Sequence, residues 1–457
     1  MDRQVWNSFA GLRVLLLQGP VGPFFARVAA ALREGGAASV QKINFSGGDW
    51  LYYRQDSTNY RGTLADWPAY LEQYLTQYRI DVLVLFGDCR PVHAAAIELA
   101  TRRGLTYWVF EEGYIRPNYV TFERHGVNGF SGLPKTVGHY AALPTTMAPP
   151  EQEVGHTFGP AARSAMAYYV AGTFGKPWFG PRVHHRSLNM FEGLVWCRSY
   201  YRKLIYRTEQ KPLLGSLSGK WSKQFFLVAL QTAGDSQVLT HSGFKSVVQF
   251  IEAVTASFAE HAPPDTLLVI KHHPMDRGYH DYTRLLRRLG RELGVAARIR
   301  YVHDLNLPTL LSHARGVIVI NSTVGLSALH HQTPVITLGK AIYDMPGLTF
   351  QGGLSRFWTD AQSQMPDLQL YWKFRNFVVD HTQLNGSFYK PMAGGDASGL
   401  IGRVALSQAM AQPHPLPAGV ADLLAHRRGA AGRDATDAAP APAGRPLLAS
   451  PHHLPKA

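Results

Sequence analysis

Two adjacent carboxylates raise the question of what chemistry the chain can do. Glu111 and Glu112 end an apolar run and precede Gly113 and Arg116 in the stretch VFEEGYIRPNYVTFE. Such residues are either exposed charges in a turn or groups that take up and release a proton during a reaction. A second carboxylate elsewhere in the chain would favour the reactive interpretation, because sugar chemistry uses two carboxyl groups with separate roles.

Asp235 supplies that second carboxylate. It lies in LQTAGDSQ, between Gln231 and Gln237, directly after another apolar run. A turn aspartate usually accepts local hydrogen bonds. Paired with Glu111 or Glu112, it could instead attack or stabilise an anomeric carbon while the other carboxylate handles the acceptor's proton. The sequence leaves the choice between the two glutamates open.

A loop that opens a helix offers groups for a phosphate. In INSTVG, Asn321, Ser322 and Thr323 lie where free backbone N–H groups and the helix dipole attract an anion. Gly325 and Ser327 would keep this face free of bulk. An ordinary Ser or Thr helix cap explains the same residues without a ligand.

A Lys-His-His-Pro sequence follows another apolar run. Lys271, His272, His273 and Pro274 can cap the strand end, bind a phosphate or contribute to a metal site. The nearby candidate metal ligands are Asp276, His280 and Asp281. One short loop seldom completes a metal site, and no HxH or HExxH spacing occurs, so we predict no metal.

Two glycine-containing loops near the N-terminus add candidate contacts. QGPVGP, with Gln18 and Gly19, lacks the G-x-G-x-x-G pattern and the P-loop lysine, and is expected to let the backbone approach a ligand. FGDCRP contributes Asp88. No G-x-S-x-G hydrolase motif is present.

These loops follow strands in an alternating pattern of apolar runs and amphipathic stretches. Continuous apolar runs are typical of strands buried on both faces, and the helices between them favour parallel βαβ units. The first series has strands at 12–18 and 79–87, a strand from 105 that gives way to a loop at Glu111, and helices at 22–36 and 91–104. The second has strands at 224–231, 265–274, 297–302, 316–322 and 333–339, with helices at 244–262, 282–293 and 323–331.

We therefore predict an α/β, GT-B-like fold with two Rossmann-like domains that face a central cleft, since such sheets bind ligands at their strand carboxyl ends. The expected segments are an acceptor-side domain at 1–140, a basic and aromatic helical insertion at 141–220, a nucleotide-binding domain at 221–370, helices crossing back at 371–407 and a disordered tail at 408–457. The tail is rich in Ala, Pro, Gly, Arg and His.

Composition limits the class of protein. The 457 residues carry a formal charge of +14, which favours a polyanionic partner, and 46% are hydrophobic, enough for large cores. Only two cysteines occur, as expected of a reducing cytoplasm. We find no signal peptide and no apolar run long enough to span a membrane, and no nucleic-acid reader motif.

The insertion combines basic, aromatic and apolar residues at near-helical spacing. Such segments either dock on anionic membranes or pack as ordinary amphipathic helices, and both interpretations stay open. The apolar residues are Leu188, Phe191, Leu194 and Val195, and the aromatic ones are Trp196, Tyr200 and Tyr201. The basic ones are Arg182, Arg186, Arg198, Arg202, Lys203 and Arg207.

The ordered set of loops resembles the capsular polysaccharide biosynthesis family, in particular its KpsS-type β-Kdo transferases. The motifs are QGP, FGD, EEGYIRPNYVT, LQxxxDSQ, KHHP and INSTVGLSALxxxTPVITLGxAIYDxPGLT, and they cover residues 12–385. EEG and HP are also similar to motifs of bacterial sialyltransferases. The resemblance implies a GT-B fold and transfer of Kdo from CMP-β-Kdo to a (lyso)phosphatidylglycerol-type lipid, which starts the oligo-Kdo linker of a Gram-negative capsule.

The resemblance also implies roles for individual residues. His273, Ser322 and Thr323 would hold the CMP phosphate, and Glu112, or else Glu111, would be the acid-base group. Asp235 would be the nucleophile of a retaining reaction, and Arg116 or Lys271 would bind the Kdo carboxylate. A Glu that binds ribose in many GT-B enzymes is replaced by Ser327.

No cofactor is expected. The resemblance implies a peripheral protein on the cytoplasmic face of the inner membrane, working with other capsule biosynthesis proteins and with no nucleic acid. The alternatives are a CMP-sugar transferase with a soluble glycan acceptor and a non-catalytic nucleotide-binding scaffold.

Overall fold

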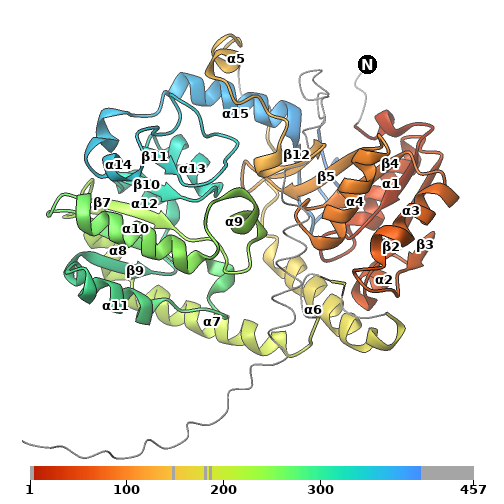
Figure 1. Cartoon of the computed structure of the whole chain (residues 1–457), viewed down its shortest axis with the longest axis horizontal. Coiled ribbons are helices and arrows are strands. Elements are labelled where there is room, and N and C mark those ends of the chain that lie inside the picture. Colours follow the sequence, from red (N-terminus) through yellow and green to blue (C-terminus); the bar gives the residue numbers. More distant parts are fainter. Residues whose placement is uncertain (1–4, 147–149, 180–182, 185–187, 403–457) are drawn as a thin grey trace, which may run out of the picture. The chain divides into compact units, whose positions relative to one another are not determined.

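Two β-sheets, each flanked by helices, organise the chain (Figure 1). The computed structural model describes residues 5–146, 150–179, 183–184 and 188–402. The first sheet has seven strands in the order β12-β6-β5-β4-β1-β2-β3, and the second has five in the order β11-β10-β7-β8-β9. The α/β, GT-B-like class predicted from the sequence is therefore confirmed. The predicted tail at 408–457 lies outside the described residues.

The first sheet is parallel except at one edge. Its parallel strands are β1 (Arg13–Leu16), β2 (Ser39–Asn44), β3 (Ser57–Asn59), β4 (Val82–Phe86) and β5 (Thr106–Glu112). β6 (Tyr119–Arg124) pairs antiparallel with β5, and β12 (Gln383–Asn385) pairs antiparallel with β6. The connecting helices are α1 (Phe24–Glu34), α2 (Gly47–Tyr52), α3 (Trp67–Gln77) and α4 (Pro91–Arg102).

The second sheet is wholly parallel and its strands are apolar on both faces. Its strands are β7 (Phe225–Ala229), β8 (Leu267–Lys271), β9 (Ile299–Val302), β10 (Gly316–Val319) and β11 (Val335–Thr337). Its helices are α9 (Ser236–His241), α10 (Val247–His261), α11 (Thr283–Glu292), α12 (Leu307–His313), α13 (Val324–His330) and α14 (Leu354–Asp360). Short 3-10 turns lie at Val5–Phe9, Asn128–Phe130, Lys176–Trp178, Pro274–Asp276, Ala296–Arg298 and Ala361–Ser363.

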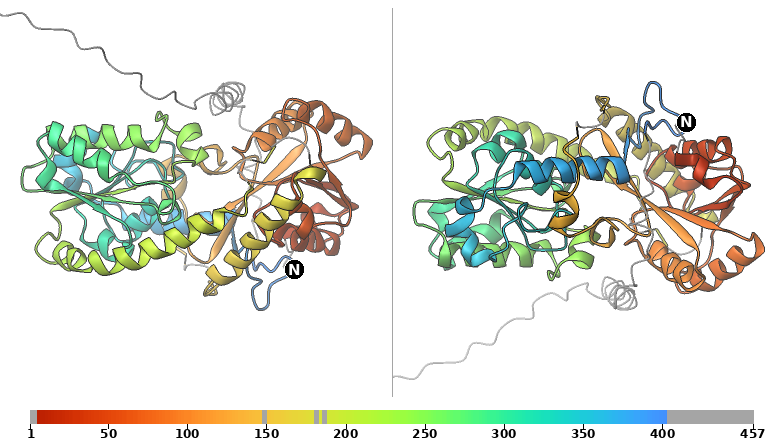
Figure 2. Two further views of the ribbon diagram at one scale, coloured as in Figure 1. Left: turned by 90° about the horizontal axis from the view of Figure 1, so that it is seen from below. Right: turned by 90° about the horizontal axis from the view of Figure 1, so that it is seen from above.

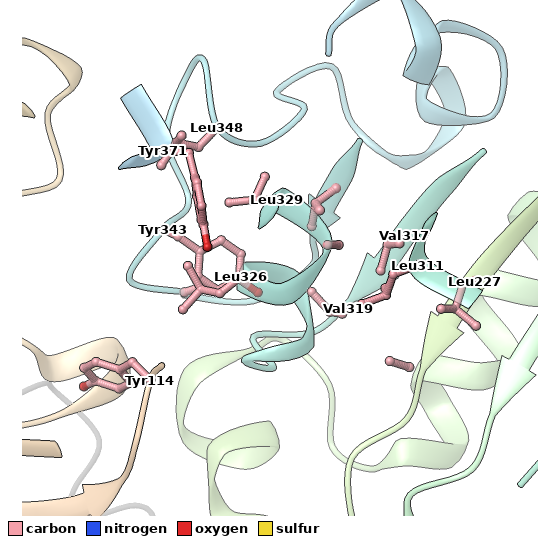
Figure 3. Packing of buried hydrophobic residues seen from close by; sticks show 14 of the residues in the cluster. Tyr114, Leu227, Leu311, Val317, Val319, Leu326, Leu329, Tyr343, Leu348 and Tyr371 are labelled. Carbon is pink, nitrogen blue, oxygen red and sulfur yellow. The ribbon is translucent and has the colours of Figure 1, made fainter. Parts of the chain in front are cut away.

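The core beneath one face of the second sheet also includes residues of the first third of the chain. Leu227, Val317 and Val319 point into a cluster with Leu326 and Leu329 of α13 (Figure 3). The same cluster includes the buried aromatic residues Tyr114, Tyr140, Tyr343 and Tyr371. The described residues consequently belong to one compact unit.

The last elements of the described residues return to the first sheet. After α15 (Leu368–Thr382), β12 completes the edge beyond β6. The Gln383 side chain accepts from the Tyr114 N–H at 3.0 Å and donates to the Thr121 hydroxyl, also at 3.0 Å. Asn385 donates to the Asn118 carbonyl. These buried amide contacts hold β12 in register.

Two long helices, α6 (Phe158–Phe174) and α7 (Glu192–Glu209), make up most of the segment between the sheets in sequence (Figure 2). They follow α5 (Val137–Ala141) and precede α8 (Lys211–Ser218). α6 packs on α2, and its Tyr169 meets Trp196 of α7 edge-on at 5.4 Å. The domain boundaries predicted from the sequence stay predictions.

Candidate functional site

Glu111 and Glu112 belong to a strand and not to the loop that the sequence suggested. β5 extends through both because the antiparallel pairing with β6 continues to Glu112, opposite Val120. Successive strand residues face opposite sides, so the two carboxylates have different surroundings. The prediction of a loop starting at Glu111 was therefore wrong.

The Glu111 side chain is half-buried beside polar groups. One oxygen accepts from the Glu112 N–H at 2.9 Å, and the other lies beside Gly87, 3.6 Å from where a Cβ on that glycine would be. Burial, together with the nearby Asp88 carboxylate, raises the pKa of Glu111 to about 7, although the Glu112 N–H and Arg90 oppose the rise. A carboxyl group with this pKa can exchange a proton near neutral pH.

Asp88, Cys89 and His241 meet where α4 begins and α9 ends. The Cys89 thiol donates to Asp88 Oδ1 at 3.1 Å and lies 3.7 Å from His241 Nε2. Burial raises the pKa of Asp88 to about 6 and lowers that of His241 to about 4. Their potential metal-ligand atoms lie within 4.8 Å of one another. Burial also raises the pKa of the Cys89 thiol, so the thiol keeps its proton. The absence of a metal stays a prediction.

Asp235 caps α9 through one carboxylate oxygen and bonds the preceding loop through the other. It accepts from the Gln237 N–H at 2.9 Å and from Gln231 Nε2 at 3.0 Å. Asn321 Nδ2 donates to the Gln237 carbonyl at 3.2 Å, so the loop after β10 also contacts this helix. The side-chain oxygens Gln231 Oε1, Gln237 Oε1 and Asn321 Oδ1 are buried and have no hydrogen-bond partner among the described residues. Unpaired buried acceptors gathered at one helix are suited to a ligand rich in hydroxyl groups.

His273 and Arg116 approach each other from the two halves of the chain. His273 Nδ1 accepts from the Met275 N–H at 3.3 Å. Burial lowers the pKa of His273 to about 4, and the positive charge of Arg116 lowers it further. The neutral imidazole therefore carries its proton on Nε2, where it can donate to a phosphate oxygen. Pro274 begins the following 3-10 turn.

Lys271 and His272 have partners within the protein. Lys271 donates to the His303 carbonyl at 2.9 Å, and burial lowers its pKa to about 8. His272 Nδ1 is 2.7 Å from the Tyr301 hydroxyl, and its ring contacts that of His303. Both residues hold the loop after β8 against β9.

The loop before α13 keeps part of its expected arrangement. Ser322 Oγ accepts from the Val324 N–H at 3.3 Å, and Thr323 stands at the N-cap without a capping side-chain bond. Ser327 is exposed. The prediction that Gly325 leaves this face open was wrong, because a Cβ there would lie 2.0 Å from the Tyr343 hydroxyl. That hydroxyl donates to the Ser322 carbonyl.

The first glycine loop also differs from expectation. A Cβ on Gly19 would lie 2.8 Å from the Phe25 ring, so this glycine permits close packing within the protein and not the expected approach of backbone to ligand. Gln18 is buried and accepts from Arg90 Nη1 at 2.9 Å. Arg90 also donates to the Gly19 carbonyl, which ties this loop to the surroundings of Glu111.

Several predicted residues thus lie around α9 and the end of β5, and the charge of Arg116 acts on His273. Sequence reasoning gave no role to Arg90 or to His241. Arg90 stands in FGDCRP next to a predicted residue, which was a usable signal. His241 had none, because its contacts with Gly129, Phe130 and Cys89 join distant segments.

The sequence model of a family described as capsule polysaccharide biosynthesis protein matches residues 81–389. The chain belongs to this family. It is 40% identical over 382 residues to the capsule polysaccharide export protein KpsS of Escherichia coli, covering 83% of this chain and 97% of that protein. It is 41% identical over 386 residues to the capsule polysaccharide modification protein LipB of Neisseria meningitidis serogroup B, covering 82% and 91%.

One solved structure is similar at low identity. The beta Kdo 2,7 transferase of Thermosulfurimonas dismutans KpsC is 15% identical, with a TM-score of 0.37, covering 79% of this chain and 89% of that one. Among the described residues, no helix combines the length and apolar character needed to cross a membrane.

Proposed function

We propose that the chain is a retaining glycosyltransferase that moves β-Kdo from CMP-β-Kdo to a (lyso)phosphatidylglycerol-type acceptor, starting the oligo-Kdo linker of a Gram-negative capsule. Family membership supports a role in capsule polysaccharide biosynthesis. The observation that carries the catalytic assignment is the pair of carboxylates in unlike environments. Glu111 is half-buried with a pKa of about 7, and Asp235 accepts hydrogen bonds from Gln231 and from the first turn of α9.

The two carboxylates take different steps. Asp235 attacks the anomeric carbon as the bond to the CMP phosphate breaks, and CMP leaves with the bonding electrons. A glycosyl ester of Asp235 results. Glu111 then takes the proton of the acceptor hydroxyl, whose oxygen displaces Asp235 with a second inversion and so restores the configuration. Glu111 replaces Glu112, the first choice from the sequence, because the pKa of Glu111 suits a general base near neutral pH.

The donor phosphate would be held by groups that favour an anion. His273 donates from Nε2, and Ser322 and Thr323 offer hydroxyls at the start of α13. Arg116, close enough to His273 to affect its pKa, is the preferred partner for the Kdo carboxylate. Lys271 is a weaker candidate because it already donates to His303. This scheme requires no cofactor.

An anionic membrane on the cytoplasmic side of the inner membrane is the proposed working surface. Residues 158–220 contain ten Lys and Arg against two Asp and Glu. Most of the exposed large apolar side chains among the described residues lie between Phe158 and Leu204. On α7 these are Leu194, Tyr200, Tyr201 and Leu204, with Phe191 just before the helix. Basic residues beside exposed apolar ones bind anionic lipid.

The insertion residues predicted from the sequence divide between two roles. Leu188 is buried, Trp196 packs on Tyr169, and Val195 lies against Gly278. Arg198 and Arg202 donate to the carbonyls of Gly278 and Arg277. Lys203 and Arg207 are exposed and are the proposed lipid contacts, whereas Arg182 and Arg186 lie outside the described residues.

The experiment incubates purified protein with CMP-β-Kdo generated in situ and a fluorescent phosphatidylglycerol analogue, and follows the acceptor mass. We expect a gain of one Kdo residue. If a soluble glycan is modified and the lipid is not, the lipid assignment fails. CMP binding without transfer to either acceptor would indicate a scaffold and overturn the enzymatic assignment.

A further inference from the structure

The two ends of α9 have different partners, and its last residue reaches the first third of the chain. Asp235 caps the start of the helix, and His241 ends it. The His241 ring meets the Phe130 ring edge-on at 4.3 Å, and its Nε2 lies 3.7 Å from Cys89 Sγ. The six residues of α9 span about 9 Å. The proposed nucleophile is therefore one short helix away from a contact with the segments around the first sheet.

The His241 ring fits closely against its neighbours. His241 is buried, and a Cβ on Gly129 would lie 2.3 Å from its Nδ1, so a residue with a side chain at position 129 would displace the ring. The two segments that contact the ring are also bonded to each other, because Asp88 Oδ2 accepts from the Val127 N–H at 2.9 Å. The ring thus lies against a connected piece of structure and not against two separate loops.

The hydrogen bonds around the ring have one consistent direction. A thiol has a single proton, and the Cys89 thiol donates it to Asp88 Oδ1 at 3.1 Å. His241 Nε2 therefore carries the proton that faces the sulfur atom, and Nδ1 is an acceptor without a hydrogen-bond partner among the described residues. Burial lowers the pKa of His241 to about 4, so the ring is neutral at physiological pH. Donors consequently point from His241 through Cys89 to Asp88.

His241 also connects the surroundings of Glu111 with the second sheet. Its carbonyl accepts from the Lys340 N–H at 2.7 Å, in the loop after β11. At the other end of the hydrogen-bond chain, the Asp88 carboxylate is close enough to Glu111 to act on its pKa. The backbone of His241 is thus bonded to one half of the chain, and its side chain contacts the other.

We propose that His241 is a positioning residue that fixes the place of Asp235 relative to Glu111. The proposal rests on the proposed function for the roles of these two carboxylates. His241 contacts neither substrate and acts through α9. A displacement of reacting groups by about 1 Å can lower a rate about a hundredfold, so loss of this contact should lower kcat. Donor binding should change little, because the proposed phosphate groups belong to other loops.

Two substitutions disturb the contact in different ways. His241→Ala removes the ring, and Gly129→Ala places a methyl group against Nδ1. Gly138→Ala, on α5, is the matched control, because a Cβ there would have no atom within 4 Å. His241→Gln is the conservative variant, since its amide N–H can take the place of Nε2–H toward Cys89.

Hydrogen exchange tests the contact without catalysis. Mass spectrometry of the full chain would follow deuterium uptake in peptides that cover residues 236–241. We expect His241→Ala and Gly129→Ala to speed this exchange about tenfold, because fewer contacts favour local opening. Gly138→Ala and His241→Gln should change it less than about twofold. Unchanged exchange in both His241→Ala and Gly129→Ala would overturn the proposal.

Kinetics distinguish positioning from a purely structural role. In the Kdo transfer assay, His241→Ala should lower kcat about a hundredfold and leave KM for the donor within about threefold, whereas His241→Gln should keep kcat within about fivefold of the wild-type value. A purely structural role would lower the free energy of unfolding, measured in urea, and leave kcat of the folded enzyme unchanged. That result would overturn the proposal.

A double variant tests whether Gly129 acts through the ring. Gly129→Ala should lower kcat in the wild-type background but have little further effect together with His241→Ala, because the methyl group then has room. An equal loss in both backgrounds would overturn the proposed contact.

The two measurements separate this proposal from the proposed function. If the wild-type chain transfers no Kdo but His241→Ala and Gly129→Ala loosen α9 in hydrogen exchange, the proposed function fails and the anchoring of α9 by His241 stands. If the wild-type chain transfers Kdo and His241→Ala keeps its kcat, the positioning role fails and the function stands.

Discussion

At the scale of single residues, strand geometry decides which of two neighbouring carboxylates can work as a base. The sequence placed Glu111 and Glu112 together at the end of an apolar run but could not orient them. Pairing of β5 with β6 turns them to opposite sides, and only Glu111 has a pKa raised to about 7. Their positions in the chain were predictable, whereas their orientations depended on the neighbouring strand.

We expect Glu111→Gln to lower kcat by about 10²- to 10⁴-fold, the usual contribution of a general base. Glu112→Gln is the matched control and should cost less than tenfold. In the wild-type chain, kcat/KM should rise with pH through about 7 as Glu111 loses its proton, and Glu111→Gln should lack this limb. A larger loss in Glu112→Gln than in Glu111→Gln would reverse the assignment.

Substitutions of Asp235 should affect both turnover and the stability of the fold. Asp235→Asn keeps a side-chain acceptor for the Gln237 N–H but removes the nucleophile, so activity should fall at least a thousandfold while the free energy of unfolding changes by less than about 1 kcal/mol. Asp235→Ala should lose the cap as well, at about 1 kcal/mol. Turnover and urea denaturation measure the two effects. Near-normal turnover in Asp235→Asn would rule out a double displacement at this residue.

At the scale of elements, long apolar strands were predictable from the sequence. Short strands that form only by pairing with a distant strand were not. The five strands of the second sheet match the predicted runs, and the three central strands β7, β8 and β10 are buried throughout, which leaves continuous apolar sequence. β12 has only three residues, Gln383–Asn385, and its identity as a strand depends on pairing with distant β6. Gly325 was misinterpreted for the same reason, since Tyr343, which covers it, comes from a later loop.

Gly325→Ala tests how tightly α13 is packed. The added methyl group would overlap the Tyr343 hydroxyl and displace it from the Ser322 carbonyl. We expect a loss of about 1–3 kcal/mol in the free energy of unfolding, which is typical of overpacking. Ser327→Ala, at an exposed position of the same helix, should change stability by less than about 0.5 kcal/mol. Equal stabilities of the two variants in urea would contradict this packing.

Charge reversal on α7 tests the membrane contact. Lys203→Glu with Arg207→Glu should lower binding to anionic liposomes at least tenfold in flotation, since each basic residue near such a surface contributes about 1 kcal/mol. The matched control reverses Arg284 and Arg287, which are exposed on α11. If both pairs reduce binding equally, net charge and not the α7 surface is responsible.

At the scale of the whole molecule, three carboxyl groups shielded from water should set the pH dependence of stability above about pH 6.5. Burial raises the pKa values of Asp88, Glu111 and Glu123 to about 6, 7 and 8. Between about pH 6.5 and 8 the folded chain keeps protons that the unfolded chain has released, so stability falls as pH rises through this window. Below about pH 6.5, histidines whose pKa burial lowers, such as His93 and His273, act in the opposite direction. Glu123, which accepts from Tyr114 and Ser131, should contribute most because its shift is largest.

Urea midpoints measured between pH 6.5 and 8 should therefore decline. Glu123→Gln should flatten the decline and be more stable than the wild-type chain at pH 9. Thr283→Gln, at the start of α11 and far from this cluster in sequence, should keep the wild-type slope. A midpoint that rises from pH 6.5 to 8 would contradict the raised pKa values.

The pairing of β12 with β6 also has a consequence for synthesis on the ribosome. Gln383 and Thr121, which bond across this edge, are 262 residues apart in the chain. At about 5–20 residues per second, the emerging polypeptide would wait roughly 13–50 s between the two strands. During that interval β6 is an open edge, available to chaperones or to another nascent chain. The sheet that starts the sequence is thus among the last parts of the protein to be finished.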